Sequence, residues 1–256
     1  MTIESPALMQ HLGTSELRSA PPLVLVPGLL CDETVWAPQL PALRRLTLVQ
    51  VAEHGSSASL ADMAETIIRE APERFALAGH SMGGRVALEV FRRVPERVAG
   101  LALLDTGCHA LDAGAAGEAE RRSRLALLEL AQRAGMRAMA LQWLQGMVHP
   151  DRLHDVALVN TICDMIARRQ TAHQAAQIEA LLSRPEAGPL LRGVGCPSLV
   201  LCGREDRWSA IPQHEEMAHA LPRSQLRIVE HCGHMCTLEQ PEILGQHLCE
   251  WLDTCR

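Results

Sequence analysis

The chain has 256 residues, a length that fits one domain with an insertion and suffices to bury a sizeable core. It is 47% hydrophobic but only 2% aromatic, so its core must be aliphatic and rich in methionine. All 24 basic residues are arginine and stand against 30 acidic residues, which leaves a net charge of −6. This balance offers no basic field for nucleic acid or anionic lipid, so we expect neither as a partner. We expect a small-molecule substrate and a monomer or homodimer.

The chain start and the cysteines bear on the compartment. Residues 1–6 have neither a basic region nor a long apolar one, and no later apolar run reaches the length of a membrane span. The nine cysteines are odd in number and scattered without a framework, which favours reduced thiols over disulfides. We expect a soluble, cytoplasmic protein.

The first half of the chain alternates between strand and helix patterns. Residues 1–20 carry at most a weak edge strand or hairpin, whereas residues 22–26 are an apolar run typical of a strand buried on both faces of a parallel sheet. This strand ends at Pro27-Gly28-Leu29, where the glycine permits a tight turn. The following elements are expected at residues 36–45 (a short helix broken by Pro38 and Pro41), 46–51 (a strand) and 60–70 (a helix with Ser59 as N-cap).

The next strand leads into a Gly-x-Ser-x-Gly motif, Gly79-His80-Ser81-Met82-Gly83, with a helical pattern directly behind it. In this strand, turn and helix context the serine is held in a strained conformation with its hydroxyl above the sheet. The motif therefore predicts Ser81 as a nucleophile and the amide of Met82 as one donor of an oxyanion hole. The amide of Leu29 is the candidate second donor. A Gly-Ser turn without chemistry is the alternative interpretation.

After a buried strand at residues 101–105 the alternation of strand and helix patterns stops. Residues 118–183 are helical throughout and contain no strand candidate, before strands return at 197–203 and 225–230. We predict an α/β fold, with a mostly parallel central sheet flanked by helices and an inserted all-helical cap. The domain boundaries predicted from this pattern are 1–107 and 193–256 for the core and 108–192 for the cap. Helices are also expected at residues 212–221 and 242–252.

Two residues behind later strands complete a catalytic constellation. Asp206 and His234 each follow a strand directly and so lie on the same sheet edge as Ser81, in the order Ser, Asp, His. His234 would take the proton of Ser81 as general base, and Asp206 would orient His234 and stabilise its imidazolium. Asp105 also ends a strand at this edge and is a rival for the acid, but the Gly-x-x-Asp context of Gly203 favours Asp206.

Four landmarks together resemble the α/β-hydrolase superfamily, in particular its small capped carboxylesterases and meta-cleavage-product hydrolases. They are Pro27-Gly28, Gly-His-Ser-Met-Gly-Gly around Ser81, Gly-Arg-Glu-Asp ending at Asp206, and Gly-His ending at His234 with Glu239-Gln240-Pro241 behind it. The usual His-Gly of the oxyanion turn is Pro27-Gly28 here. The resemblance implies cleavage of a carboxylic ester through an acyl-enzyme, without a cofactor.

Other interpretations remain open. The resemblance also allows C–C bond hydrolysis of meta-cleavage products, although that group often has Asn where this chain has His80. A non-catalytic binding protein of the same fold is a third possibility, but such proteins typically lose a triad member. A metal site from His231, Cys232, His234 and Cys236 would need zinc ligands at two separated turns, and we expect no metal. Cys31 lies on the oxyanion turn and has two interpretations, a thiol that reagents can reach or, as for most isolated cysteines, a small apolar filler.

Overall fold

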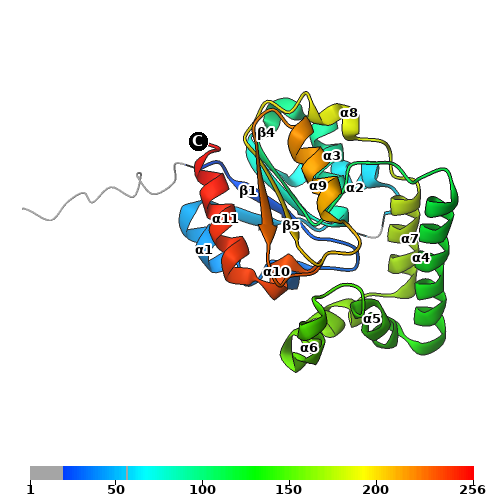
Figure 1. Cartoon of the computed structure of the whole chain (residues 1–256). Helices are drawn as coiled ribbons and strands as arrows, with labels where there is room; N and C mark the ends of the chain where they lie inside the picture. Colours follow the sequence, from blue (N-terminus) through cyan, green and yellow to red (C-terminus); the bar gives the residue numbers. More distant parts are fainter. Residues whose placement is uncertain (1–19, 56) are drawn as a thin grey trace, which may run out of the picture.

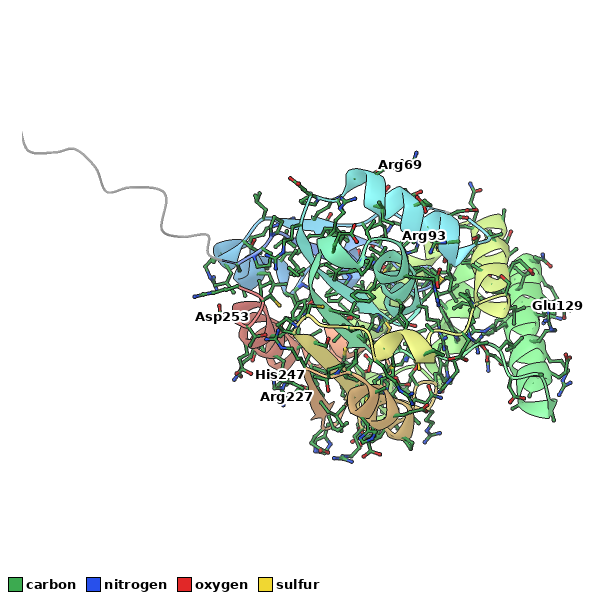
Figure 2. The ribbon with its side chains drawn as sticks, turned by 90° about the horizontal axis from the view of Figure 1, so that it is seen from above. Arg69, Arg93, Glu129, Arg227, His247 and Asp253 are labelled. Carbon is green, nitrogen blue, oxygen red and sulfur yellow. The ribbon has the colours of Figure 1, made fainter. Side chains whose placement is uncertain are left out.

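The structure, a computed structural model, describes residues 20–55 and 57–256. The weak strand or hairpin expected at residues 1–20 lies outside this part of the chain, apart from Ala20. No helix in the described residues is long and apolar enough to cross a membrane. Charged side chains such as Arg69 and Glu129 point outward from the helices that carry them (Figure 2).

A sheet of six strands in the order β2-β1-β3-β4-β5-β6 forms the centre, and every neighbouring pair is parallel. The strands are β1 (Leu23–Val26), β2 (Val49–Val51), β3 (Phe75–His80), β4 (Val98–Leu104), β5 (Ser198–Gly203) and β6 (Ser224–Val229). His80 pairs with Leu104, and Leu104 with Leu201, so the carboxyl ends of the central strands are level. The loops that follow these strands therefore meet at one edge of the sheet.

Helices cover both faces of the sheet (Figure 1). One face carries α1 (Leu40–Leu46) and α11 (Pro241–Asp253), and the other carries α2 (Leu60–Glu70), α3 (Met82–Arg93) and α9 (Ile211–Ala220). The four central strands β1, β3, β4 and β5 consist entirely of buried residues, as expected for a parallel sheet sandwiched between two helical layers. Short helical turns complete the layers: η1 (Glu33–Val35), η2 (Pro95–Arg97), α8 (Gly188–Leu191) and α10 (Cys236–Glu239).

Between β4 and β5 the chain forms further helices that stand beyond the sheet (Figure 1). They are α4 (Ala115–Ala134), α5 (Met136–Leu144), η3 (Pro150–His154), α6 (Val156–Ala167) and α7 (Thr171–Leu182). The prediction of a helical insertion without a strand is confirmed for this segment. We propose residues 108–192 as the boundaries of the cap.

The local predictions succeeded where a single periodicity operates. Helix α2 has the expected bounds, and the Ser59 hydroxyl accepts a hydrogen bond from the Asp62 amide at 3.3 Å, as an N-cap does. The helix expected at 36–45 begins only at Leu40, with Pro41 in its first turn, where no amide donor is needed. It runs on to Leu46, so the strand expected at 46–51 is shortened to β2.

Candidate active site

Ser81 lies in a strained turn between β3 and α3. Its backbone has φ 56° and ψ −120°, in a region that L-residues rarely adopt. A Cβ on Gly79 would collide with the Gly83 carbonyl, and a Cβ on Gly83 with the Val26 carbonyl, so both positions require glycine. The Thr106 hydroxyl donates to the Ser81 carbonyl at 2.7 Å. The turn is thus held by close backbone packing and a side-chain bond that the sequence did not reveal.

We expect Gly83→Ala to lower the free energy of unfolding by about 1–3 kcal/mol, because the new methyl group meets the backbone of β1. Gly245→Ala in α11 is the matched control, since nothing lies within 4 Å of its Cβ and alanine favours a helix. Thermal unfolding of both variants checks this. A Gly83→Ala variant as stable as Gly245→Ala would contradict the packing described for the turn.

The structure brings Ser81, His234 and Asp206 together. Nε2 of His234 lies 2.7 Å from the Ser81 Oγ, and Nδ1 lies 2.8 Å from Oδ2 of Asp206. The other oxygen of Asp206 accepts from the amides of Trp208 and Ser209 at 2.9 and 3.0 Å. An ionised carboxylate only accepts, so Nδ1 of His234 carries the proton and Nε2 is free to accept from Ser81.

The charges of this pair stabilise each other. Burial alone would lower the pKa of His234, but the negative charge of Asp206 and its hydrogen bond outweigh burial and raise this pKa above its ordinary value. Burial would likewise raise the pKa of Asp206, yet the His234 charge and the backbone amides lower it. The geometry therefore favours an ionised Asp206 facing an imidazole that readily takes up a proton.

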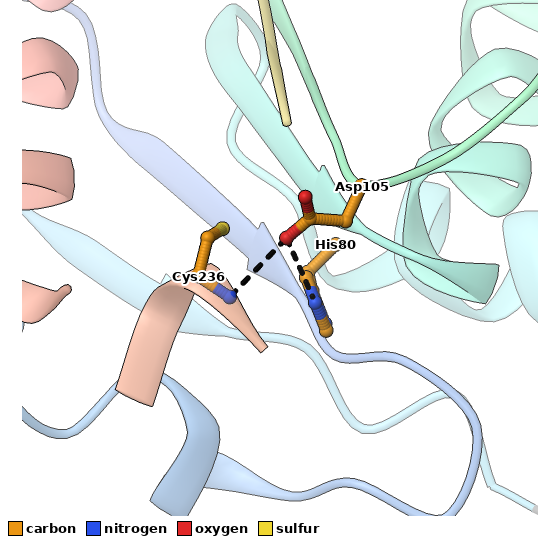
Figure 3. Close-up of side chains that lie close together, drawn as sticks. All are labelled: His80, Asp105 and Cys236. Atoms are coloured by element: carbon orange, nitrogen blue, oxygen red, sulfur yellow. Dashed lines mark hydrogen bonds and ion pairs between the residues drawn. The ribbon is translucent and has the colours of Figure 1, made fainter. Parts of the chain in front are cut away.

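Asp105 lies beneath this group and is bonded differently. Its Oδ1 accepts from the amide of Gly203 at 3.0 Å, and its Oδ2 accepts from the amide of Cys236 at 3.3 Å (Figure 3). Nε2 of His80 is 3.5 Å from Oδ2 and donates to the His234 carbonyl at 2.8 Å. Asp105 thus ties the end of β5 to the start of α10, and these two segments flank the loops that carry Asp206 and His234.

His80, Asp105 and Cys236 are also the one group of three or more potential metal-ligating side chains found within residues 20–55 and 57–256 (Figure 3). Both oxygens of Asp105 are taken by backbone amides, and burial raises the pKa of the Cys236 thiol well above its ordinary value. A protonated thiol is a poor metal ligand. This donor set is therefore suited to a structural role. It is not the His231, Cys232, His234 and Cys236 set considered above.

The two amides expected to form an oxyanion hole belong to residues that both line the cavity in front of Ser81, Leu29 and Met82. Met82 begins α3, so its amide has no acceptor within the helix. The turn of Leu29 is supported from behind, where Nε2 of His54 lies 3.0 Å from the Pro27 carbonyl. Cys31 is buried in this turn and its pKa is raised by burial to about 12. The structure favours the interpretation of Cys31 as a small apolar filler.

Glu239 supports the loop of His234. Its buried carboxylate accepts from the amides of Gly233, Met235 and His149 at 2.7–3.1 Å. The amide of His234 itself donates to the Met147 carbonyl at 2.7 Å. The loop is therefore fixed both by the core and by the segment after α5. The sequence identified Glu239 as part of a landmark but not this function.

A cavity of about 730 Å³ opens in front of Ser81 and His234, between the core and helices α4, α5 and α7. This volume suits a small or medium-sized organic substrate. Trp208 and Trp143 form one wall, with ring centroids 5.2 Å apart, and Trp208 also packs on His234 at 5.1 Å. Arginines line another part of the cavity. None of these lining residues other than Ser81, His234, Leu29 and Met82 was singled out from the sequence as a site residue.

Comparison with known proteins places this geometry in a family. A pimeloyl-[acyl-carrier protein] methyl ester esterase of Nitrosomonas europaea is 29% identical over 244 residues, which cover 91% of this chain and 95% of that protein. A 2-hydroxy-6-oxononadienedioate/2-hydroxy-6-oxononatrienedioate hydrolase of Paraburkholderia phymatum is 28% identical over 185 residues, covering 70% of this chain and 62% of that protein.

Among solved structures, a malate-bound thermophilic esterase from Thermogutta terrifontis superposes with a TM-score of 0.81 at 27% identity, covering 92% of this chain and 90% of that chain. The profile of the Alpha/beta hydrolase family matches residues 23–245, which include Ser81, Asp206 and His234. The chain is therefore a hydrolase and belongs to the alpha/beta hydrolase family.

Proposed function

We propose that this protein hydrolyses a carboxylic ester through an acyl-enzyme formed on Ser81. The observation that carries the proposal is the unbroken hydrogen-bonded chain from the Ser81 hydroxyl through His234 to Asp206, at the mouth of a cavity. The esterases among its relatives support an ester as substrate. No cofactor is required for this reaction.

In the proposed mechanism the Ser81 Oγ attacks the ester carbonyl carbon while Nε2 of His234 takes its proton. The carbonyl oxygen becomes an oxyanion, which the amides of Leu29 and Met82 stabilise. Collapse of this intermediate expels the alcohol, which receives the proton from His234. Water, activated by the same histidine, then cleaves the acyl-enzyme and restores Ser81. The strained Ser81 backbone holds the hydroxyl in position throughout.

We assign the acid of the triad to Asp206 and not to Asp105. Of these two carboxylates, that of Asp206 alone has an oxygen at hydrogen-bond distance from the His234 ring, and its second oxygen is fixed by two amides. Asp105 is linked to the His234 segment through His80 and the Cys236 amide. Its role in the proposal is to position the two loops.

The pH dependence of the reaction follows from His234. The imidazole must be neutral to accept the serine proton, and its pKa is raised above 6.5. Activity (kcat/KM) should therefore fall as the pH falls, with the midpoint of the acidic limb above 6.5. In Asp206→Asn the raising charge is lost, so the midpoint of the residual activity should shift to lower pH. A pH profile of kcat/KM for both proteins measures this.

His109 provides the control for that profile, because its pKa is also raised, mainly by the Glu216 carboxylate. His109→Gln should leave the midpoint unchanged. If the midpoint moved in His109→Gln and stayed in place in Asp206→Asn, the titrating group would be His109. That result would contradict His234 as the base.

Hydrolysis of p-nitrophenyl esters, from acetate to long acyl chains, tests the proposed function. We expect turnover that disappears in Ser81→Ala and shows an optimum of chain length, which would measure the acyl side of the cavity. The alternative of C–C hydrolysis, represented by the Paraburkholderia relative, predicts turnover of 2-hydroxy-6-oxononadienedioate and little turnover of simple esters. Absence of Ser81-dependent turnover on every ester would overturn the ester proposal.

A further inference from the structure

The cavity in front of Ser81 carries an excess of positive charge. Arg85, Arg124 and Arg184 all line it, and Glu120 is the one acidic side chain among its described lining residues. Three guanidinium groups against one carboxylate leave two positive charges in excess. The whole chain has a net charge of −6, so the excess in the cavity is not a consequence of overall composition.

Two of the arginines share the single carboxylate. Both Nη atoms of Arg184 donate to the two oxygens of Glu120 at 2.8 Å, and Nε of Arg124 donates to the same carboxylate at 2.9 Å. Burial would raise the pKa of Glu120, but Arg184 and Arg124 lower it to about 2. Glu120 therefore stays ionised and is fully used in holding these two side chains in place.

Arg85 has no such partner. No carboxylate in residues 20–55 or 57–256 forms an ion pair with it, and its Nη1 donates to the neutral carbonyl of His109 at 2.8 Å. Burial and the positive charge of Arg184 lower its pKa to about 9, so it remains charged at neutral pH. A half-buried guanidinium beside two others costs free energy unless an anion approaches it.

The guanidinium-bearing residue Arg85 lies close in the chain to Ser81, where the ester bond would react. Arg85 lies four residues after Ser81 in the first turn of α3, about 6 Å further along the helix axis. Both residues line the same cavity. A short chain of carbon atoms on the substrate can therefore join an ester carbonyl at Ser81 to a group at Arg85.

We propose that Arg85, supported by Arg124 and Arg184, binds an anionic oxygen group of the substrate, a carboxylate or a phosphate. The proposal rests on the proposed function and narrows it, since the substrate is then an ester that carries a second, negatively charged end. Guanidinium groups suit both anions because their paired N–H donors match two oxygens at once. The hydrogen bonds of Glu120 to Arg124 and Arg184 hold these two arginines in position before the substrate binds.

A matched pair of substrates tests the proposal. The p-nitrophenyl monoester of adipic acid ends in a carboxylate, and the corresponding adipamic ester ends in a neutral amide of the same shape. We expect kcat/KM to favour the carboxylate by at least about tenfold in the wild-type protein, as for a hydrogen bond to a charged group. A third ester of the same length ends in a phosphonate. A higher kcat/KM for this ester than for the carboxylate indicates a phosphate subsite, and the reverse indicates a carboxylate subsite.

Arg85→Gln should reduce this preference to near unity through the KM of the charged ester. Arg69→Gln is the control, because it removes one positive charge from the exposed surface of α2 (Figure 2), and Arg69 is not among the residues that line the cavity. A wild-type protein without preference for either charged ester, or a preference that survives Arg85→Gln, would overturn the inference while leaving the ester proposal intact.

Failure of the proposed function would look different, because neither ester would be turned over and a fluorophosphonate would not label Ser81. Calorimetric titration with adipate then decides the anion site by itself. Binding that is lost in Arg85→Gln and kept in Arg69→Gln supports the site, and no binding of adipate or inorganic phosphate to the wild type overturns it.

Discussion

Ser81→Ala and His234→Ala should each lower kcat on a p-nitrophenyl ester by about a millionfold, the loss seen when a triad nucleophile or base is removed. Ser81 supplies the attacking oxygen, and Nε2 of His234, 2.7 Å away, is placed to take its proton. Ser81→Ala removes a single side-chain oxygen, whereas His234→Ala removes a buried ring, so thermal unfolding and circular dichroism of each variant must show a folded protein before its activity is compared.

Two substitutions outside the site serve as controls. Ser183 follows α7 and its hydroxyl donates to the Glu179 carbonyl of that helix, and His247 lies on the outer face of α11 (Figure 2). Ser183→Ala and His247→Ala should retain wild-type activity. A folded Ser81→Ala variant with more than a few per cent of wild-type activity would show that another residue is the nucleophile.

Asp206→Asn should lower kcat by about ten-thousandfold, because an amide in place of the carboxylate no longer holds the His234 ring in the productive tautomer. The Oδ1 contacts to two backbone amides remain possible for the Asn oxygen, so the loop of Asp206 should keep its conformation. Steady-state kinetics of the purified variant, at the pH of maximal activity, measure this loss.

Asp105→Asn is the matched comparison, since Asp105 ends the neighbouring strand and is equally buried. It loses acceptor strength toward the amides of Gly203 and Cys236, so it should lower the unfolding temperature more than Asp206→Asn. Its kcat should stay within about tenfold of the wild type, because it does not contact the His234 ring. The opposite ranking of the two kcat values would make Asp105 the acid.

The parts of the fold that the sequence predicted are those in which one pattern dominates. The buried strands and α2 could be predicted from hydrophobic periodicity. The Ser81 turn could be predicted from its glycines, because its tight backbone leaves no room for a side chain at those positions. The order of Ser81, Asp206 and His234 then placed all three at one sheet edge. Boundaries failed where a proline lies in the first turn of a helix, as Pro41 does in α1.

The remaining features depend on contacts between distant segments. Periodicity does not show which face of a cap helix looks into the cavity, so Arg124 and Arg184 carried no signal in the sequence. The position of Arg85 was a usable signal in the sequence, because a residue one helical turn after the nucleophile lies near the same cavity. Burial of Cys31 and the anchoring of the His234 loop by Glu239 became visible only in the folded chain.

Covalent labelling of Ser81 tests the central claim most directly. A fluorophosphonate reacts with a serine hydroxyl that a neighbouring base activates, and the adduct can be located by peptide mass mapping. We predict stoichiometric labelling at Ser81 in the wild type and none in His234→Ala. Absence of label at Ser81, or labelling that persists without His234, would contradict the account of Ser81 as a nucleophile activated by His234.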